Sequence, residues 1–491
     1  MLKLALKSII SITIILILTT TGISIGLTKS TDIDPLVDLK ITIDILKIRS
    51  LEHEDPQLDF REVIDPNNDP DFYTKVIVNG QSFTSDIIWN KRYIYNNPFS
   101  VTVNVPDTTE NVDIKIQLWD AAEEYYMTDR LCDISPDNGT DTDAFDAEIV
   151  YNLKNGHWTG DDELKDASGY GRLNGCSDGT IYKKDRDCEL WFDVTFNDFD
   201  SDGIPYFIED TVYGTNPCEN DSYKDFDLDN VSTWWEFKYG YDPFTFDDHK
   251  QLDPDIDGIK NYYEFITSKW YSDPFTRDLF LELDEMEEGP NGEISIFPNR
   301  AKEMLYTVHD RQNLVYHLDD GNLGGPTGSE LIPFDDLTDQ SELYNIRDEF
   351  FYNTSPESWR KYVFHYGVLI WKSNVVAGNA FGRNAFQISS RLLQDIVVKK
   401  GYDRDVVFAS AYMHETGHNL KFYPIPGHHY LGWLMRIFLP LYKSCMSYGM
   451  IYRMVDYSDG SRPFLGRFFG DYNDWERMDL TYFLGDESID D

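Results

Sequence analysis

The sequence is short of positive charge. Its 491 residues include 43 lysines and arginines against 87 aspartates and glutamates, so the formal net charge is −44. Nucleic-acid binding depends on Lys and Arg side chains that neutralise phosphates, and this balance excludes nucleic acid as a partner. Self-repulsion on this scale also destabilises the folded state unless something offsets it. The composition therefore favours a protein that binds divalent cations.

Long apolar runs are absent after the N-terminus. There, Lys3 and Lys7 precede an uncharged run rich in Ile and Leu from Ser8 to Leu27. A basic stretch followed by an apolar stretch is typical of an export signal. Residues 1–27 are either a cleaved signal peptide or a retained signal-anchor, because the run is close to the length that spans a bilayer. We expect a secreted or cell-surface-anchored protein that contacts a membrane only through this segment or through the sandwich domain below.

Cysteine is scarce, and none of the five cysteines has the CxxC spacing of a zinc or redox motif. In the oxidising compartment that an export signal implies, some of them should form disulfides. Cys176 and Cys188 bracket a polar loop and are the pair that we expect to be bridged. The odd number leaves at least one thiol free or bonded to another chain.

The remaining composition, with 41% hydrophobic and 15% aromatic residues, is that of a folded chain, and its length allows two to four domains. From residue 36 to 155, short runs that alternate apolar and polar residues are separated by clusters of Pro, Asn and Asp. The clearest runs are DLKITIDIL, FYTKVIVNG, FSVTVNV and VDIKIQLWD. Alternation with period two indicates half-buried strands, and the pattern predicts an antiparallel β-sandwich.

Two stretches of this sandwich resemble the calcium- and lipid-binding sandwiches of the C-two type. DPDFYTKVIVNGQ is similar to the first calcium loop of that family and the strand after it. LWDAAEEYYMTDRLCDI is similar to the third loop, with Asp120 and Asp129 at matching positions and Ala122 where the family usually has another carboxylate. The resemblance implies calcium-binding loops, and the alternative is a plain sandwich with acidic loops.

After a cysteine-containing connector over residues 156–196, an internal repeat covers residues 197–275. DFDSDGIPYFIE, DFDLDNVSTWWE and DPDIDGIKNYYE each carry carboxylates at positions 1, 3 and 5, Gly or Asn at position 6, and Glu at position 12. This is the ligand spacing of an EF-hand loop, in which alternate carboxylates converge on one cation and the last Glu closes the shell. The predicted calcium ligands are Asp198, Asp200, Asp202, Glu209, Asp225, Asp227, Asp229, Glu236, Asp253, Asp255, Asp257 and Glu264.

The helices that follow these loops are predicted to be short. Each meets an Asn-Pro or Asp-Pro pair within a few turns, and proline disfavours helix at the residue before it. These pairs are Asn216-Pro217, Asp242-Pro243 and Asp273-Pro274. The repeat resembles the thrombospondin type 3 calcium arrays of secreted proteins more than it resembles paired EF-hands. That resemblance implies a spacer that calcium makes rigid.

Residues 276–491 are predicted to form an α/β (α+β) domain. LFLELDEM and YVFHYGVLIW are typical of strands, and VVFASAYMHETGHNL has the apolar spacing of a helix. On this helix, His414 and His418 are four residues apart and project from one face. Glu415 is rotated toward a water on the metal, whose proton it takes as general base. The HExxH pattern thus predicts a catalytic zinc site.

A second motif lies downstream of this helix. KSCMSYGM, residues 443–450, resembles the Met-turn of the metzincin peptidases. Together with HExxH, it makes the domain metzincin-like. The resemblance implies that Met446 underlies the zinc site and that Tyr448 approaches the metal and stabilises the oxyanion. It also implies a protein or peptide substrate.

The third zinc ligand departs from the metzincin pattern. That pattern has Gly and His where this sequence has Lys421 and Pro424. A catalytic zinc normally takes three protein ligands, and His428 and His429 follow a few residues later. Consecutive side chains diverge, so we expect one of them to bind, with His429 preferred and His428 in reserve. Asp456 is a carboxylate alternative.

The sequence therefore predicts a multidomain chain with an N-terminal antiparallel β-sandwich, a calcium-loop repeat segment and a C-terminal metzincin-like catalytic domain. The predicted activity is hydrolysis of peptide bonds by a calcium-stabilised zinc endopeptidase, with zinc and calcium as cofactors. The alternative is a catalytically inactive, calcium-binding adhesive or scaffolding protein with a relic peptidase domain. Stoichiometric zinc distinguishes the two.

Overall fold

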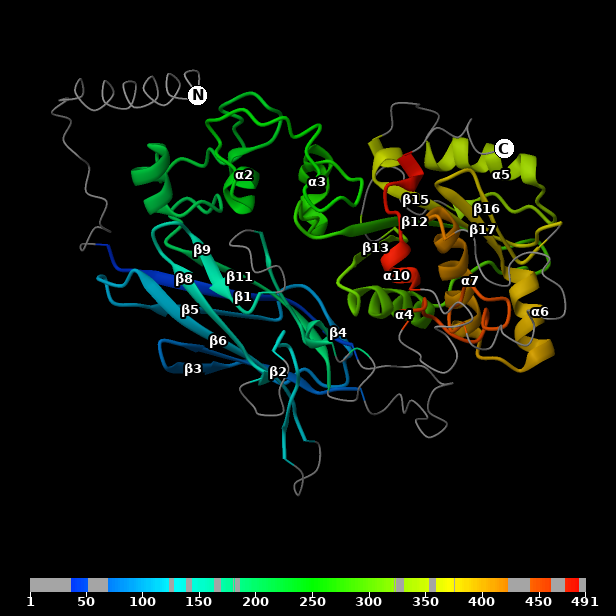
Figure 1. Ribbon diagram of the computed structural model, residues 1–491, viewed down its shortest axis with the longest axis horizontal. Coiled ribbons are helices and arrows are strands. Elements are labelled where there is room, and N and C mark those ends of the chain that lie inside the picture. The colour runs from blue at the N-terminus through cyan, green and yellow to red at the C-terminus, as the bar shows by residue number, and fades with distance from the viewer. Residues whose placement is uncertain are drawn as a thin grey trace, which may run out of the picture.

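The computed structural model describes residues 37–51, 69–122, 128–137, 144–162, 169–179, 181, 186–321, 323, 331–352, 359–374, 376–422, 442–460 and 473–484. The predicted export signal, residues 1–27, lies outside these ranges. Within them, every helix is too short or too polar to cross a membrane. Figure 1 shows three parts in chain order: a blue-to-cyan sandwich, a green segment of loops and short helices, and a domain that runs from green through yellow to red.

The first part consists of two antiparallel sheets. In one, β1 pairs with β4, β5 and β11, and β10 extends the sheet beside β11; in the other, the order is β3-β2-β6-β8-β9, with β7 beside β6. Alternation along β6 places Val112, Ile114, Ile116 and Leu118 in the core, each at most 1% exposed. The predicted β-sandwich is therefore confirmed. Its strands are β1 (Lys40–Ser50), β2 (Phe72–Val78), β3 (Gln81–Thr84), β4 (Tyr93–Ile94), β5 (Phe99–Asn104), β6 (Asn111–Asp120), β7 (Arg130–Leu131), β8 (Ala147–Asn152), β9 (His157–Gly160), β10 (Gly171–Asn174) and β11 (Cys188–Phe196).

Residues 156–196, expected to be a connector, supply strands of the sandwich. β9 pairs with β8, and β11 pairs with β1. Cys176 lies in a 3-10 turn (η2, Gly175–Asp178), and its Sγ donates to Oδ2 of Asp187 over 3.4 Å. No cysteine among the described residues forms a disulfide, so the predicted Cys176–Cys188 bridge is wrong. A buried carboxylate, rather than a second sulfur, is bonded to the Cys176 thiol.

The second part carries the three acidic loops, each followed by a short helix. These helices are a π-helical turn (η3, Ile208–Tyr213), α2 (Thr233–Tyr239), and α3 (Asn261–Thr267) with a 3-10 turn after it (η4, Ser268–Trp270). Each ends before its Asn-Pro or Asp-Pro pair, as predicted. A small apolar cluster of Val231, Trp235 and Tyr239 packs inside the segment. So small a core contributes little burial, and other interactions must stabilise the segment.

The third part is a mixed sheet with helices. The strand order is β13-β12-β15-β17-β16; β16 is antiparallel to β17, whereas the other neighbours are parallel. Its strands are β12 (Asp278–Met286), β13 (Val315–Asp319), β14 (Leu331–Ile332, beside β12), β15 (Phe364–Ile370), β16 (Gly378–Phe381) and β17 (Ala385–Ser389). Its helical elements are α4 (Asn299–Asp310), α5 (Gln340–Ile346), η5 (Arg347–Phe351), η6 (Trp359–Tyr362), α6 (Ser390–Lys400), α7 (Arg404–Asn419), α10 (Asp474–Arg477) and η8 (Tyr482–Leu484). The strands predicted from LFLELDEM and YVFHYGVLIW are β12 and β15.

Helix α4 connects the sandwich to the third part. Arg49 of β1 forms ion pairs with Glu303 (3.1 Å) and Asp310 (2.9 Å) of α4. Nε of Arg311, just after α4, donates to the carbonyl oxygen of Leu51 over 2.6 Å. Because α4 also packs against α7, these contacts hold the sandwich beside the helix that carries HExxH.

Candidate metal centres

Helix α7 carries both histidines of the HExxH motif. Asp403 caps its N-terminus by accepting the backbone N–H groups of Asp405 and Val406. The helix packs against α4, α6, β16 and β17, and every residue from Val406 to Asn419 is buried. Polar side chains inside such a core need hydrogen-bond partners or a ligand.

His414 and His418 lie side by side, with ring centroids 5.0 Å apart and ring planes at 89°. Nδ1 of His414 lies 2.9 Å from the carbonyl oxygen of Cys445. Because a carbonyl oxygen only accepts, Nδ1 carries the proton and Nε2 keeps its lone pair. Burial lowers the pKa of His414 to about 4, although the bond to Cys445 opposes the shift. A neutral imidazole with its other nitrogen bonded to a carbonyl is the form that binds zinc.

The side chain of Glu415, on α7, lies against strand β16. Its carboxylate accepts the backbone N–H of Ala380, and a Cβ added at Gly378 would come within 2.3 Å of its Oε1. Burial raises the pKa of Glu415 to about 8, and the N–H of Ala380 opposes that shift. A buried carboxyl group with a pKa near neutrality, oriented by a strand, has the properties of a general base.

The predicted Met-turn packs against α7. Met446 is fully buried, and a Cβ added at Gly417 would lie 2.5 Å from its Sδ, so the thioether can approach the helix because residue 417 is glycine. Tyr448 is 55% exposed, and its ring centroid lies 6.1 Å from that of His414. The structure thus places both predicted residues beside the histidine pair.

The chain turns sharply just after α7, at the position where the metzincin pattern has glycine. Lys421 adopts φ of 62°, the left-handed conformation for which glycine is favoured, and its Nζ pairs with Asp479 over 3.2 Å. Asp456, the carboxylate alternative for zinc, is buried and accepts the indole N–H of Trp475 over 3.4 Å. His428 and His429 lie outside the described residues.

The three acidic loops converge as their spacing predicts. In each loop, carboxylate oxygens from positions 1, 3 and 5 lie within 4.8 Å of one another. The chain turns at position 6, where Gly203, Asn230 and Gly258 have φ of 91°, 82° and 96°. The position-1 carboxylates of Asp198 and Asp225 each accept three backbone N–H groups from their own loop. The first two loops therefore form closed turns around their first carboxylate.

The glutamate at position 12 is fully buried in every loop. Glu209, Glu236 and Glu264 are each 0% exposed. Among the described residues, neither carboxylate oxygen of Glu236 or Glu264 has a hydrogen-bond partner, and Oε2 of Glu209 has none. Burial, followed by the neighbouring aspartates, raises the pKa of Glu209 to about 8 and that of Glu236 to about 9. Buried carboxylates that face one another without donors are costly unless a cation joins them.

This donor set fits calcium. The predicted ligands are carboxylates, and calcium prefers about six to eight oxygen ligands. Oxygens without a hydrogen-bond partner in the described part of the chain also occur on Asp200, Asp227, Asp253 and Asp255. The position-3 and position-12 residues thus direct oxygens that lack protein donors into each loop.

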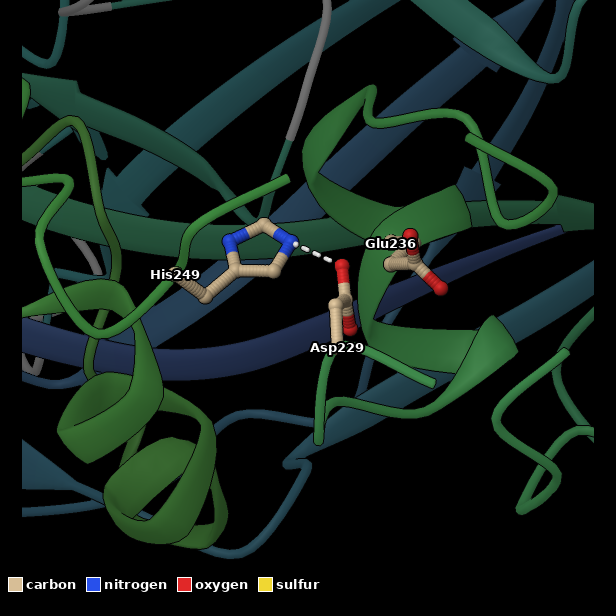
Figure 2. Close-up of side chains that lie close together, drawn as sticks. All are labelled: Asp229, Glu236 and His249. Atoms are coloured by element: carbon tan, nitrogen blue, oxygen red, sulfur yellow. Dashed lines mark ion pairs between the residues drawn. The ribbon is translucent and has the colours of Figure 1, made fainter. Parts of the chain in front are cut away.

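A histidine from outside the second loop lies beside it, and the sequence pattern does not identify this residue. Figure 2 shows His249 facing Asp229, with Glu236 on the neighbouring helix α2. Nε2 of His249 lies 3.1 Å from Oδ2 of Asp229, and all three side chains are buried. In the first loop, a backbone N–H, that of Ser222, lies 3.1 Å from Oδ2 of the equivalent Asp202. The position-5 carboxylate of the second loop thus faces His249 and one backbone N–H, that of Asp247, whereas that of the first loop accepts two, those of Asp221 and Ser222.

The pattern also misses three aspartates that contact the loops from outside. The backbone N–H groups of Asp221, Asp247 and Asp278 donate to Oδ2 of the position-5 aspartate in the preceding loop, at 3.2, 3.3 and 2.8 Å. Asp221 also contributes an oxygen to the cluster that contains Asp202 and Glu209. The signal for these residues is in the sequence, because each stands five positions after the Asn or Asp of an Asn-Pro or Asp-Pro pair.

The acidic loops of the sandwich have protein donors instead. Asp120 accepts a backbone N–H over 2.9 Å and forms an ion pair with Arg130. Asp129 accepts the hydroxyl of Tyr73 (2.9 Å) and the N–H of Ala122 (3.0 Å). This geometry favours the plain sandwich with acidic loops over a calcium-binding one.

No protein-family model matches the sequence, and no curated protein matches it. Solved structures similar to this chain include human GIVD cytosolic phospholipase A2 in complex with methyl gamma-linolenyl fluorophosphonate, at 10% identity over 32% of this chain and 17% of that chain, with a TM-score of 0.18. A C2 domain matches at 12% identity over 32% of this chain and 97% of its own, with a TM-score of 0.18. The calcium-bound pair of C2 domains of Extended-Synaptotagmin 2 matches at 13% identity over 33% of this chain and 46% of that chain, with a TM-score of 0.20. These likenesses include C2 domains, at low coverage and identity, and carry no argument about function.

Proposed function

We propose that this chain is a calcium-stabilised zinc endopeptidase. The observation that carries the proposal is the hydrogen bond from Nδ1 of His414 to the carbonyl oxygen of Cys445. It joins the HExxH helix to the turn of Met446 and leaves Nε2 of His414 with its lone pair. Two separate motifs of the sequence thereby meet, which supports a metzincin-like zinc site.

Each residue of this site has a role in the proposal. His414 and His418 would bind the zinc, with His429, or His428 in its place, as third ligand. Zinc, when bound, supplies a Lewis acid and lowers the pKa of a bound water. Glu415 takes the proton of the attacking water and gives it to the leaving amine. The Tyr448 hydroxyl donates a hydrogen bond to the oxygen of the scissile carbonyl as negative charge develops there.

Strand β16 supports a peptide as the substrate. It is the last strand of the sheet, and within the described residues it pairs with β17 alone. Its residues Gly378 and Ala380 contact Glu415. An extended peptide can add to such an open edge through backbone hydrogen bonds, independent of its side chains. A substrate bound there passes the general base.

The test is hydrolysis of a fluorescently quenched casein by the full chain in calcium, with zinc content measured on the same samples. Glu415→Gln should lower the rate by about 10²–10⁴-fold, the range for loss of a general base, while zinc stays bound. Glu476→Gln, the same change at an exposed position of α10, serves as the control and should match the parent.

Two results would overturn the proposal. Hydrolysis by Glu415→Gln at the parental rate would remove the proposed base. A folded parent that holds no zinc and cleaves nothing would instead favour the adhesive or scaffolding alternative.

A further inference from the structure

The calcium repeat is longer than its loops. Each repeat continues through its helix to an Asn-Pro or Asp-Pro pair and ends at an aspartate five positions after the first residue of that pair. The closing stretches are NPCEND, DPFTFD and DPFTRD, which end at Asp221, Asp247 and Asp278. In all three, the N–H of the closing aspartate donates to the position-5 carboxylate of its own repeat. The closing aspartate is therefore a recurring element of the repeat unit within this chain.

The third closing aspartate differs in its place in the fold. Asp221 and Asp247 stay within the calcium segment, whereas Asp278 is the first residue of β12, in the sheet of the third part. In Figure 1, β12 passes from the green segment near α3 into that sheet. The last repeat and the third part thus share a residue.

Both carboxylate oxygens of Asp278 have hydrogen-bond partners in the protein. Its Oδ1 lies 2.7 Å from Nε2 of His317 on β13, and its Oδ2 accepts the Ser272 hydroxyl (3.0 Å) and the Asp273 N–H (3.1 Å). The His317 ring stacks on Phe280 of β12, with centroids 4.0 Å apart. A shift of Asp278 would therefore disturb the first two strands of the sheet.

The third loop faces this aspartate with carboxylates that lack donors. Glu264 is 0% exposed, and among the described residues neither of its oxygens has a hydrogen-bond partner. Oδ1 of Asp253 and Oδ2 of Asp255 also have none in the described ranges, although Lys260 pairs with Asp253 through its other oxygen, over 3.2 Å. The N–H of Asp278 reaches Oδ2 of Asp257 over 2.8 Å. One lysine does not balance four carboxylates, of which Asp257 and Glu264 are buried and the other two half-buried, and an oxygen-binding cation does.

We propose that a calcium ion in the third loop, held by Asp253, Asp255, Asp257 and Glu264, clasps the calcium segment to the third part of the chain through the bond from the Asp278 N–H to Asp257. This inference rests on the proposed calcium binding and gives the third site a structural role. Filling that site fixes the start of β12 and, through His317, β13. The first site, closed by Asp221, has the same ligand pattern without a link to the sheet.

The experiment compares Glu264→Gln with Glu209→Gln in the full chain, because each glutamate closes one loop and glutamine keeps the size of the side chain. Calorimetric titration with calcium chloride should show one ion fewer than the parent for each variant. Hydrogen exchange then separates them. With calcium, amides of β12 and β13 should exchange at least about tenfold faster in Glu264→Gln than in Glu209→Gln, which should resemble the parent in these strands.

The parent itself provides a test that does not depend on either variant folding. Removal of calcium, with zinc resupplied, should speed exchange in β12 and β13. Equal protection of these strands with and without calcium would overturn the clasp, and so would a Glu264→Gln variant that binds as many ions as the parent. A parent that binds no calcium would overturn calcium binding as well, whereas loss of peptidase activity alone bears on neither.

Discussion

The sandwich and the calcium segment both carry acidic loops, and they stabilise that charge in opposite ways. In the sandwich, Asp120 and Asp129 accept hydrogen bonds from backbone, Tyr and Arg donors. In the calcium segment, Glu236 and Glu264 are more deeply buried, and no donor among the described residues reaches their oxygens. A carboxylate that accepts hydrogen bonds from the protein is already stabilised, whereas a buried carboxylate without such donors requires a cation. The lack of protein donors, rather than the presence of acidic residues, identifies a cation site.

Calcium removal should produce the largest difference between the two regions. A ligand that binds only the folded state stabilises it, by about 4 kcal/mol at a concentration of a thousand times its dissociation constant. We expect amides of residues 198–264 to lose protection from hydrogen exchange in calcium-free buffer, while those of β6 keep theirs. Equal loss in both regions would remove the distinction.

The pH dependence should reverse with calcium. Without calcium, Glu209 and Glu236 have pKa values of about 8 and about 9 in the folded chain, against about 4.3 for an unfolded glutamate. The folded chain then binds more protons than the unfolded chain between about pH 4 and about pH 9, so stability falls as pH rises through this window. The calcium-free Tm should be lower at about pH 8 than at about pH 5.

With calcium saturating, the same carboxylates bind as anions, and protons compete with the metal. The stabilisation that calcium provides should therefore grow between the same two pH values. Calorimetric scans with and without calcium at both values measure this. A calcium-free Tm that rises with pH would contradict the burial of unpaired carboxylates.

Removal of one negative charge should change the free energy of unfolding in opposite directions in the two regions. In calcium-free buffer, Glu236→Gln should stabilise the fold, because it relieves repulsion from the neighbouring aspartates. Asp120→Asn should destabilise the sandwich by about 1–3 kcal/mol with or without calcium, because it breaks the pairing with Arg130 and weakens a buried hydrogen bond. Denaturant unfolding of both variants gives the comparison. Destabilisation by Glu236→Gln in the absence of calcium would argue that this side chain has a protein partner.

The smallest effect concerns His249, which holds Asp229 from outside its loop. Its replacement by alanine removes one close contact to a ligand, so calcium affinity at the second site should fall by about tenfold or less. Calorimetric titration of His249→Ala measures the change. Loss of all binding at that site would instead make His249 a direct ligand.

Features encoded by local spacing could be predicted from the sequence. The alternation in VDIKIQLWD predicts β6, and the spacing of DFDSDGIPYFIE predicts the convergence of Asp198, Asp200 and Asp202. HExxH places His414 and His418 on one face of a helix because a helix repeats every 3.6 residues. In each case, the chain brings its own neighbours together.

Features that depend on tertiary contacts could not be predicted. The link between Asp278 and Asp257 crosses from a strand to a loop, and His249 reaches the second loop from the segment after α2. Lys421 adopts a conformation usually left to glycine, and it forms an ion pair with the distant Asp479. Strand β11 pairs with β1, which lies far away in the sequence. Local pattern carries no information about such partners.

The most direct test of a calcium-stabilised zinc peptidase is hydrolysis of quenched casein by the full chain, dialysed free of calcium with zinc resupplied, as calcium is added back. The account predicts little hydrolysis at the start and a rate that rises as the calcium sites fill. Full activity without calcium would show that the peptidase does not depend on the calcium sites. No hydrolysis at any calcium concentration by a folded, zinc-loaded chain would contradict the proposed activity.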